Sequence, residues 1–297
     1  MLTLRRRLGL IIGALLLVIT LSGCQSVHKQ TANSKLQIVA STPTYGQMAT
    51  QIAGKYAQVT TIMANPNVDP HDFEPTVQNA KQTSRAQIAI YNGLGYDSWM
   101  NRLLVNNQQA TKINIGQLMH KQVGDNPHLW YHPQTMPTAA QHLAEVLRRQ
   151  DPTHRAYYQQ RAQKYLQSLQ PLQQQIHQIK IHHQQKLVAV SEPVFDYSLQ
   201  KMGYQIANPH FAQAIEEGAD PAPQDINKLQ QLIKTRKIAF LVDNQQAANP
   251  VVANLVKLAQ KYQVPVVKVT ETQPANLSYL QWMERQYHKV LTIEVQK

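Results

Sequence analysis

Short apolar runs alternate with helical patterns along most of this 297-residue chain, and this alternation restricts the fold more than any other feature. Apolar runs of this length, separated by helices, are typical of buried parallel strands. The first set comprises Leu36–Ala40, Val59–Met63, Ile88–Tyr91 and Ile113–Ile115. The second set comprises Leu187–Val190, Ile238–Val242, Val264–Val269 and, as a further candidate, Val290–Ile293. The pattern predicts an α/β fold of two lobes, each a mostly parallel sheet flanked by helices.

Helical patterns lie between the apolar runs of each set. In the first lobe we expect helices over Met48–Tyr56, Pro75–Ser84 and Ser98–Leu104. In the second lobe we expect them over Val194–Met202, Ala222–Thr235 and Pro250–Tyr262.

A long helical stretch separates the two sets. After a helix over Met136–Arg149, Asp151 and Pro152 provide an N-cap and a first-turn proline for another helix. Apolar residues continue in it at helical spacing, and Pro171 can kink it. Since a flexible linker would be richer in Gly and Ser, we expect one long rigid helix over residues 151–185. Such a helix argues against a large hinge closure.

The N-terminal residues have the features of an export signal. Three arginines, Arg5 to Arg7, precede the apolar segment Leu8 to Leu21, which is shorter than the ~20 residues that a membrane-spanning helix needs. Small residues then precede Cys24, the chain's single cysteine, so a disulfide framework is excluded. The segment resembles a bacterial lipoprotein signal, in which Cys24 is lipidated; a short membrane anchor or an ordinary cleaved signal is the alternative.

This interpretation predicts five segments along the chain. They are a signal peptide (1–23), a flexible tether (24–35), an N-terminal lobe (36–150), a linking helix (151–185) and a C-terminal lobe (186–297). The protein is then expected on the extracytoplasmic face of the cell membrane, anchored by its lipid.

Histidine and carboxylate side chains follow the predicted strands. His71 and His128 lie in proline-flanked loops, and Glu192 and Glu271 each end an apolar run. Because ligands of parallel α/β sheets bind outside the carboxyl ends of the strands, these four side chains are candidate metal ligands, two from each lobe. The nearby prolines restrict the backbone and would hold the ligands in place before a metal arrives.

The motifs around these residues also resemble a known family. The segments Asp69 to Pro75, Tyr91 to Met100 and Asn126 to Tyr131 are similar to motifs of the zinc- or manganese-binding solute receptors of bacterial ABC importers. The resemblance implies two α/β lobes joined by a long helix, with the metal held between the lobes. It implies His71, His128, Glu192 and Glu271 as the ligands, Mn²⁺ or Zn²⁺ as the transported ligand, and an ABC permease as the partner.

Two features bear on which metal would bind. The Irving–Williams order predicts that zinc binds at least as tightly as manganese. The second carboxylate and the lack of a His-rich loop near His71 nevertheless favour manganese.

Other histidines are alternative ligands. His132 is four residues after His128, but Pro127 and Pro133 argue against a regular helix there, so we interpret His132 as a surface or supporting residue. His210 competes with Glu192 for the third ligand position, although its polar loop setting favours a structural role. Three acidic residues are expected to cap helices or orient the imidazoles: Asp72, Glu74 and Asp97.

The motif content favours a receptor over an enzyme. Four protein ligands leave little room for the water that a catalytic zinc retains, and hydrolase and phosphate-loop motifs are missing from the sequence. A zinc-dependent hydrolase is one alternative. A surface adhesin is another, because the net charge of +12, which becomes +9 once residues 1–23 are removed, favours weak attraction to anionic surfaces. An exported chain without a basic, aromatic-rich stripe is not expected to bind nucleic acid. We expect a monomer.

Overall fold

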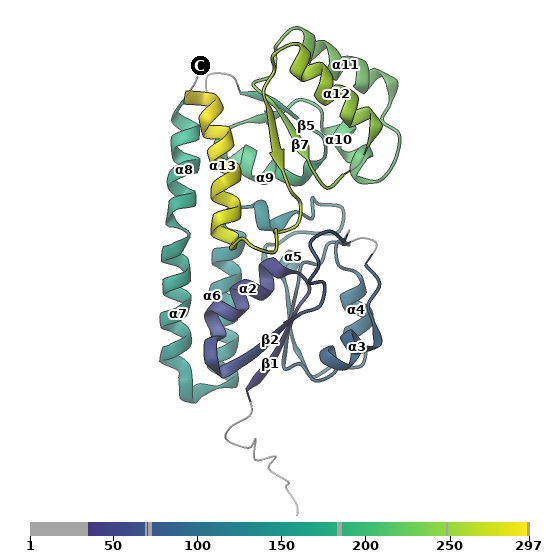
Figure 1. Cartoon of the computed structure of the whole chain (residues 1–297). Coiled ribbons are helices and arrows are strands. Elements are labelled where there is room, and N and C mark those ends of the chain that lie inside the picture. The colour runs from purple at the N-terminus through teal and green to yellow at the C-terminus, as the bar shows by residue number, and fades with distance from the viewer. Residues whose placement is uncertain (1–34, 69, 71–72, 183–185, 248, 296–297) are drawn as a thin grey trace, which may run out of the picture. The chain divides into compact units, whose positions relative to one another are not determined.

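Two four-stranded parallel sheets form the framework of the protein (Figure 1). The structure, a computed structural model, describes residues 35–68, 70, 73–182, 186–247 and 249–295. Cys24, the predicted signal and all of the predicted tether except Lys35 lie outside these residues. In the described part of the chain, no helix is both long enough and apolar enough to cross a bilayer.

Both sheets have the same strand order. The first has the order β2 (Ala57–Thr61), β1 (Leu36–Ala40), β3 (Ile88–Tyr91) and β4 (Thr111–Asn114). The second has the order β6 (Gln205–Ile206), β5 (Leu187–Val190), β7 (Leu241–Asn244) and β8 (Val266–Val269). All neighbouring strands are parallel, which confirms the predicted α/β class. The chain order reverses between β1 and β3 and again between β5 and β7, which is where such sheets bind ligands.

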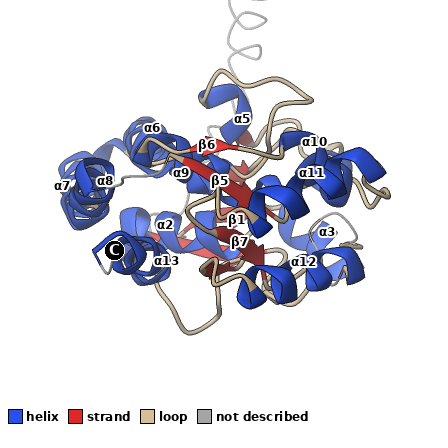
Figure 2. Ribbon diagram, turned by 90° about the horizontal axis from the view of Figure 1, so that it is seen from above, coloured by secondary structure: helices blue, strands red, loops and turns tan. Residues whose placement is uncertain are grey.

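Helices cover both sides of the strands (Figure 2). In the first lobe the helices lie between the strands in sequence or follow the last of them. They are α2 (Pro43–Ala53), α3 (Val77–Thr83), α4 (Trp99–Leu104), α5 (Ile115–Leu118) and α6 (Thr135–Gln150). The second carries α9 (Asp196–Met202), α10 (Pro209–Glu216), α11 (Pro223–Lys234), α12 (Pro250–Lys261) and α13 (Tyr279–Val295). Helix α2 begins at Pro43, earlier than the apolar spacing predicted, because a proline fits the first turn of a helix.

The predicted long helix consists of two consecutive helices, α7 (Arg155–Ser168) and α8 (Gln170–His182), that follow one another beside both sheets (Figure 1). Leu169 separates them, and Pro171 lies in the first turn of α8. Proline has no amide hydrogen to donate to the turn before it, which accounts for the break.

The expectation of a strand over Val290–Ile293 is wrong. These residues belong to α13, whose buried side chains recur every three or four residues from Tyr279 through Trp282, Met283 and Tyr287 to Val290. The fourth strand of the second sheet is instead β6, a two-residue strand too short to produce an apolar run.

One hydrophobic core extends under both sheets. It contains Ile38 and Ile90 from the first sheet, Val190 and Val242 from the second, and buried residues of α2, α6, α8 and α13. On its other face each sheet has a separate cluster, around Trp99 in the first lobe and around Phe211 in the second. The lobes are therefore distinct in topology but share their largest core.

Buried hydrogen bonds cross this shared core. Tyr131 is fully buried, and its one hydroxyl proton is shared between two acceptors: the carbonyl oxygen of Thr270 at 2.5 Å and Oε1 of Gln286 at 2.9 Å. The hydroxyl of Ser198 donates to the carbonyl oxygen of Tyr131 at 2.6 Å. These bonds tie the loop after β4 to α9, α13 and the loop after β8.

We predict that Tyr131→Phe destabilises the protein by about 1–3 kcal/mol, because it leaves buried acceptors without their donor. Urea unfolding followed by circular dichroism measures the change. Tyr262→Phe removes the same hydroxyl from a partly exposed ring next to α12 and serves as the control. Equal stability of both variants would contradict the assigned role of the Tyr131 hydroxyl.

Candidate metal centre

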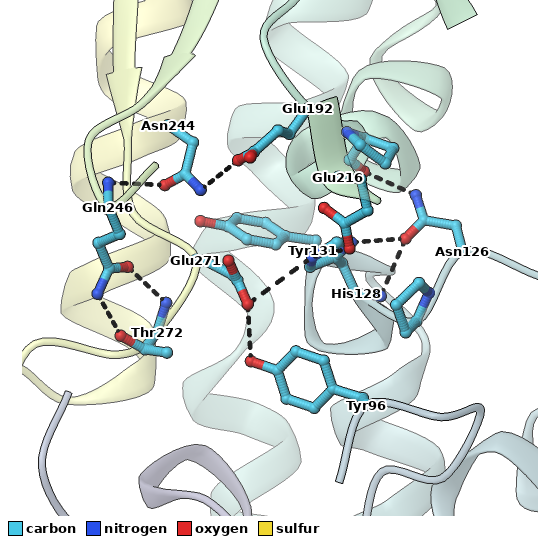
Figure 3. Close-up of polar contacts among 12 residues, drawn as sticks. Tyr96, Asn126, His128, Tyr131, Glu192, Glu216, Asn244, Gln246, Glu271 and Thr272 are labelled. Carbon is cyan, nitrogen blue, oxygen red and sulfur yellow. Dashed lines mark hydrogen bonds and ion pairs between the residues drawn. The ribbon is translucent and has the colours of Figure 1, made fainter. Parts of the chain in front are cut away.

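The candidate site lies at the carboxyl ends of the strands of both sheets. Glu192 follows β5 directly after Ser191, and Glu271 follows β8 directly after Thr270. His128 comes from the loop between α5 and a short 3₁₀ helix, Leu129–Tyr131. The two sheets thus direct side chains from distant parts of the sequence toward one place (Figure 3).

His128 is fully buried, and its two ring nitrogens have different surroundings. Nδ1 lies 2.8 Å from Oδ1 of Asn126. Nε2 lies 3.5 Å from Oε1 of Glu216 and 3.9 Å from Oε1 of Glu271. The ring therefore faces an amide on one side and carboxylates on the other.

Asn126 fixes the orientation of this ring. Its Nδ2 donates to the carbonyl oxygen of Pro193 at 2.7 Å, which directs its Oδ1 toward His128. That oxygen accepts from the backbone N–H of His128 at 2.9 Å as well as from Nδ1. We assign the proton to Nδ1 from this network, so Nε2 presents its lone pair to the carboxylates. The same amide links the loop of His128 to the loop of Glu192.

Asp97 supports the loop that contains Pro127 and His128 through a chain of hydrogen bonds. It is buried, and its carboxylate accepts the backbone N–H groups of Asn92 at 2.6 Å and Gly93 at 2.8 Å. Burial raises the pKa of Asp97, and these hydrogen bonds act in the opposite direction. Asn92 then donates from Nδ2 to the carbonyl oxygen of Pro127 at 2.9 Å. Asp97 thus supports the loop of His128 through Asn92 and Pro127, whereas the acceptor at Nδ1 of His128 is Asn126.

Glu271 is held by a phenol from the other sheet. The hydroxyl of Tyr96 donates to Oε1 of Glu271 at 3.1 Å. Burial raises the pKa of Tyr96 well above its ordinary value, and the nearby Glu271 carboxylate raises it further. The phenol therefore stays protonated and acts as a donor.

Glu192 is buried and contacts β7, the strand that neighbours β5 where the strand order reverses. Its Oε2 accepts from Nδ2 of Asn244, the last residue of β7, at 2.6 Å. Figure 3 shows its carboxylate directed toward Asn244, whereas those of Glu216 and Glu271 are directed toward His128.

Glu216 was not predicted from the sequence. It is the last residue of α10, and its side chain is only 12% exposed. Pro209 begins this helix, and Phe211, Ala212 and Ile215 are its buried residues. A proline after Asn208 together with that spacing is a helix-start signal that could have placed Glu216 at a helix end.

His71 lies outside the described residues, as do Asp69 and Asp72, but the residues on either side are described. The carbonyl oxygen of Pro70 accepts from Nε1 of Trp99 at 3.1 Å, and the ring of Phe73 lies 4.7 Å from that of Trp99. Pro70 also lines a cavity of about 250 Å³ together with Gln246, Glu271 and Thr272. The residue before His71 and one predicted ligand thus share a cavity.

The alternative histidines contact other groups. His132 is partly buried and lies edge-on to the ring of Tyr197 at 5.4 Å. Burial and the nearby Lys201 and Lys121 lower its pKa. His210 is exposed at the start of α10 and lines a different cavity, of about 90 Å³.

Glu74, which we expected to cap a helix or orient an imidazole, forms an exposed ion pair with Arg102 at 3.6 Å instead.

The donor types suit a divalent transition metal. Imidazole nitrogen with carboxylate oxygen is a combination used for zinc and manganese. Within the described ranges, no group of three or more His, Cys, Asp or Glu side chains could hold a metal ion by itself.

The fold and these donors define a two-lobed protein with a candidate cation site at its strand ends. The model of the family described as "Zinc-uptake complex component A periplasmic" matches residues 38–292, and the chain therefore belongs to this family. The resemblance stated from the motifs is confirmed.

Two curated relatives and one solved structure give the range of this similarity. The manganese ABC transporter substrate-binding lipoprotein PsaA of Streptococcus anginosus is 26% identical over 254 residues, covering 80% of this chain and 81% of the relative. The iron ABC transporter substrate-binding lipoprotein MtsA of Streptococcus pyogenes serotype M1 is 28% identical over 255 residues, with the same coverage. The periplasmic zinc-binding protein TroA of Treponema pallidum has a TM-score of 0.71 at 16% identity, covering 88% of this chain and 99% of that chain.

One buried acid near Glu192 makes stability depend on pH. Asp196 begins α9, and burial raises its pKa to about 7. The folded state therefore binds a proton that the unfolded state has lost above pH ~4. Because the folded pKa is the raised one, stability is fully present below pH ~4 and falls as pH rises through about 7, by up to ~1.4 kcal/mol per pH unit.

We predict that Asp196→Asn removes this dependence and is more stable than the wild type at pH 8 by roughly 1–3 kcal/mol. Urea unfolding at pH 5 and pH 8 measures it. Asp220→Asn, at an exposed position, is the control. A wild type and an Asp196→Asn variant that lose stability in parallel would refute the prediction.

Proposed function

We propose that the protein is an extracytoplasmic receptor, not an enzyme, that captures a divalent transition metal and delivers it to an ABC-type permease. We assign the ligands to His71, His128, Glu192 and Glu271. The N-terminal metal-binding lobe then comprises residues 36–150, the linking helix residues 151–185 and the C-terminal metal-binding lobe residues 186–297.

The single observation that carries this proposal is the orientation of His128. A fully buried imidazole directs its lone-pair nitrogen at carboxylates from another part of the fold. Its distances of 3.5 and 3.9 Å to them exceed the 2.7–3.2 Å of an N–H···O hydrogen bond. Two donors of a tetrahedral ion with ~2.1 Å bonds are about 3.4 Å apart, so a shared cation accounts for the shorter spacing.

The two ligands from other loops are supported by their surroundings. Pro70 is fixed on Trp99 and borders the same cavity as Glu271, which favours a position near the site for the next residue, His71. Glu192 lies at the carboxyl end of β5, beside the point where the strand order reverses. Its loop is joined to that of His128 through Asn126 and Pro193.

The chemistry of the donors admits either Mn²⁺ or Zn²⁺ as cargo. Two neutral imidazoles and two carboxylates would give a nearly neutral complex with a divalent ion, which limits the cost of burying it. Relatives of similar identity are named for manganese and for iron, so membership in the family leaves the metal to be decided by this chain's own donors.

The place of action follows from the N-terminus. Relatives are named as lipoproteins of ABC transporters, and this chain has its only cysteine after an apolar segment and small residues. Lipidation of Cys24 would tether a monomeric receptor on the outer face of the membrane, next to its permease.

We predict that Mn²⁺ or Zn²⁺ raises the unfolding temperature of the metal-free protein. A ligand at 100 times its dissociation constant stabilises the folded state by about 2.7 kcal/mol. His128→Ala is expected to abolish the shift, because it removes the oriented nitrogen. Differential scanning fluorimetry with each metal measures it.

His210→Ala is the matched control, since it removes an exposed imidazole from the start of α10. It is expected to keep the full shift. If neither metal raised the unfolding temperature of the wild type, the receptor proposal would be wrong. If His210→Ala lost the temperature shift while Glu192→Ala kept it, His210 would be the third ligand.

We predict that Cys24→Ser moves the protein from the membrane fraction to the soluble fraction, because the thiol that carries the lipid is gone. Fractionation of cells expressing each form, followed by immunoblotting, measures it. Ser22→Ala, two residues earlier, is the control for changes in the signal that spare the thiol. A Cys24→Ser protein that stays with membranes would argue for an uncleaved anchor.

A further inference from the structure

A cavity of about 250 Å³ gives access to Glu271, one of the proposed ligands. One wall consists of Asn67, Val68 and Pro70 in the loop after β2, and the other consists of the segments that follow β7 and β8. A second hollow beside Glu271 measures only about 10 Å³, which is room for one water at most. Since a water takes ~30 Å³ in the liquid, the larger cavity holds several. Of these two, only the larger cavity has the room that a hydrated cation needs to reach Glu271.

Short hydrogen bonds join the two walls at the edge of this cavity. Nε2 of Gln246 donates to the carbonyl oxygen of Pro66 at 2.7 Å and to Oγ1 of Thr272 at 2.6 Å. Oγ1 of Thr272 donates to the same carbonyl oxygen at 2.6 Å. Oε1 of Gln246 accepts from the backbone N–H of Thr272 at 2.8 Å, which fixes the direction of the amide (Figure 3). We call these four hydrogen bonds the Pro66 latch, because they hold Pro66 of the first lobe against the second lobe.

The second-lobe side of the latch is tied to the segments of two proposed ligands. Thr272 is buried and directly follows Glu271. The backbone N–H of Gln246 donates to Oδ1 of Asn244 at 3.2 Å, and Nδ2 of Asn244 donates to Glu192. This side of the latch therefore has a fixed position relative to the candidate site.

The first-lobe side of the latch is a turn that is held by its own hydrogen bonds. The backbone N–H of Asn67 donates to Oδ1 of Asn65 at 3.0 Å, and that of Val68 donates to the carbonyl oxygen of Asn65 at 3.3 Å. Pro66 lies inside this turn, and proline restricts its backbone. A movement of the turn away from the second lobe breaks the latch bonds to Pro66 but leaves the bonds within the turn intact.

We propose that Gln246, through the Pro66 latch, is a positioning residue that sets the rate at which the metal enters and leaves the site; this rests on the proposed function. The latch consists of protein groups alone, so it has to open for entry as well as for exit. The net contribution of one hydrogen bond corresponds to roughly 5-fold in an equilibrium constant. Loss of the bonds to Pro66 thus raises the open fraction, and with it both rate constants by the same factor. The dissociation constant, which is their ratio, stays nearly unchanged.

The test uses two substitutions that keep the shape of the side chain. Gln246→Met keeps the length of the side chain without its amide, and Thr272→Val keeps the branching without the hydroxyl. Gln260→Met makes the first substitution at an exposed position of α12 and is the control. Protein loaded with Zn²⁺, or in a parallel series with Mn²⁺, is mixed with excess chromogenic chelator in a stopped-flow spectrometer, which gives the release rate. Equilibrium competition with the same chelator gives the dissociation constant.

Gln246→Met and Thr272→Val are each expected to release metal about 5-fold faster or more, with dissociation constants within about 2-fold of the wild type. Gln260→Met is expected to match the wild type in both. Release at the wild-type rate in the two latch variants overturns the inference while the receptor function stands. Faster release with an equal rise in the dissociation constant also overturns it, because Gln246 would then stabilise the bound state and not the closed latch. A wild type that binds neither metal overturns the proposed function and this inference with it.

Discussion

The hydrogen bonds of one amide, that of Asn126, determine the arrangement of the candidate site. The side chain satisfies the buried ring of His128 through Oδ1 and reaches the carbonyl oxygen of Pro193 through Nδ2. Because an amide has distinct donor and acceptor ends, the bond to Pro193 decides which nitrogen of His128 is protonated and which faces the carboxylates. Pro127 and Pro193 restrict the two loops that the amide joins. The scaffold therefore sets the direction of the imidazole before any ligand arrives, and it links that direction to the position of Glu192.

The shared core restricts how such a site can open. Separating the two sheets as rigid bodies would expose core residues of α2, α8 and α13 and break the buried bonds of Tyr131. The loops at the strand ends are held together by fewer and less buried hydrogen bonds. The carbonyl oxygen of Pro66 accepts from Gln246 at 2.7 Å and from Thr272 at 2.6 Å, near the surface. A rearrangement of these loops breaks a few partly exposed hydrogen bonds, so it costs far less than a movement of whole lobes.

Apolar periodicity predicted the parts of the fold that are long and regular, and motifs predicted the residues that lie at strand ends. Apolar periodicity failed for Val290–Ile293, because so short a run that is mostly apolar fits a strand or one side of a helix equally well. Only packing against α8 decides between the two. Apolar periodicity also missed β6, which is held by pairing with β5 and not by its own composition. Glu216 was not predicted as a site residue, because a pair of glutamates before a glycine does not indicate which of the two side chains points inward. That depends on the rotation of α10 about its axis, which the burial of Phe211 and Ile215 fixes.

The partners of the carboxylates explain how such a site can favour a cation. An amide binds Glu192, a phenol binds Glu271, and the imidazole of His128 lies against Glu216 and Glu271. A divalent ion that approaches Glu192 or Glu271 does not have to displace the amide of Asn244 or the phenol of Tyr96 as a competing positive charge, because both groups are neutral. Neutral donors position the oxygen atoms without using up their charge. The amide and the phenol thus orient the carboxylate oxygens of Glu192 and Glu271 while leaving their negative charge in place, and negative charge at the strand ends favours the entry of a 2+ ion.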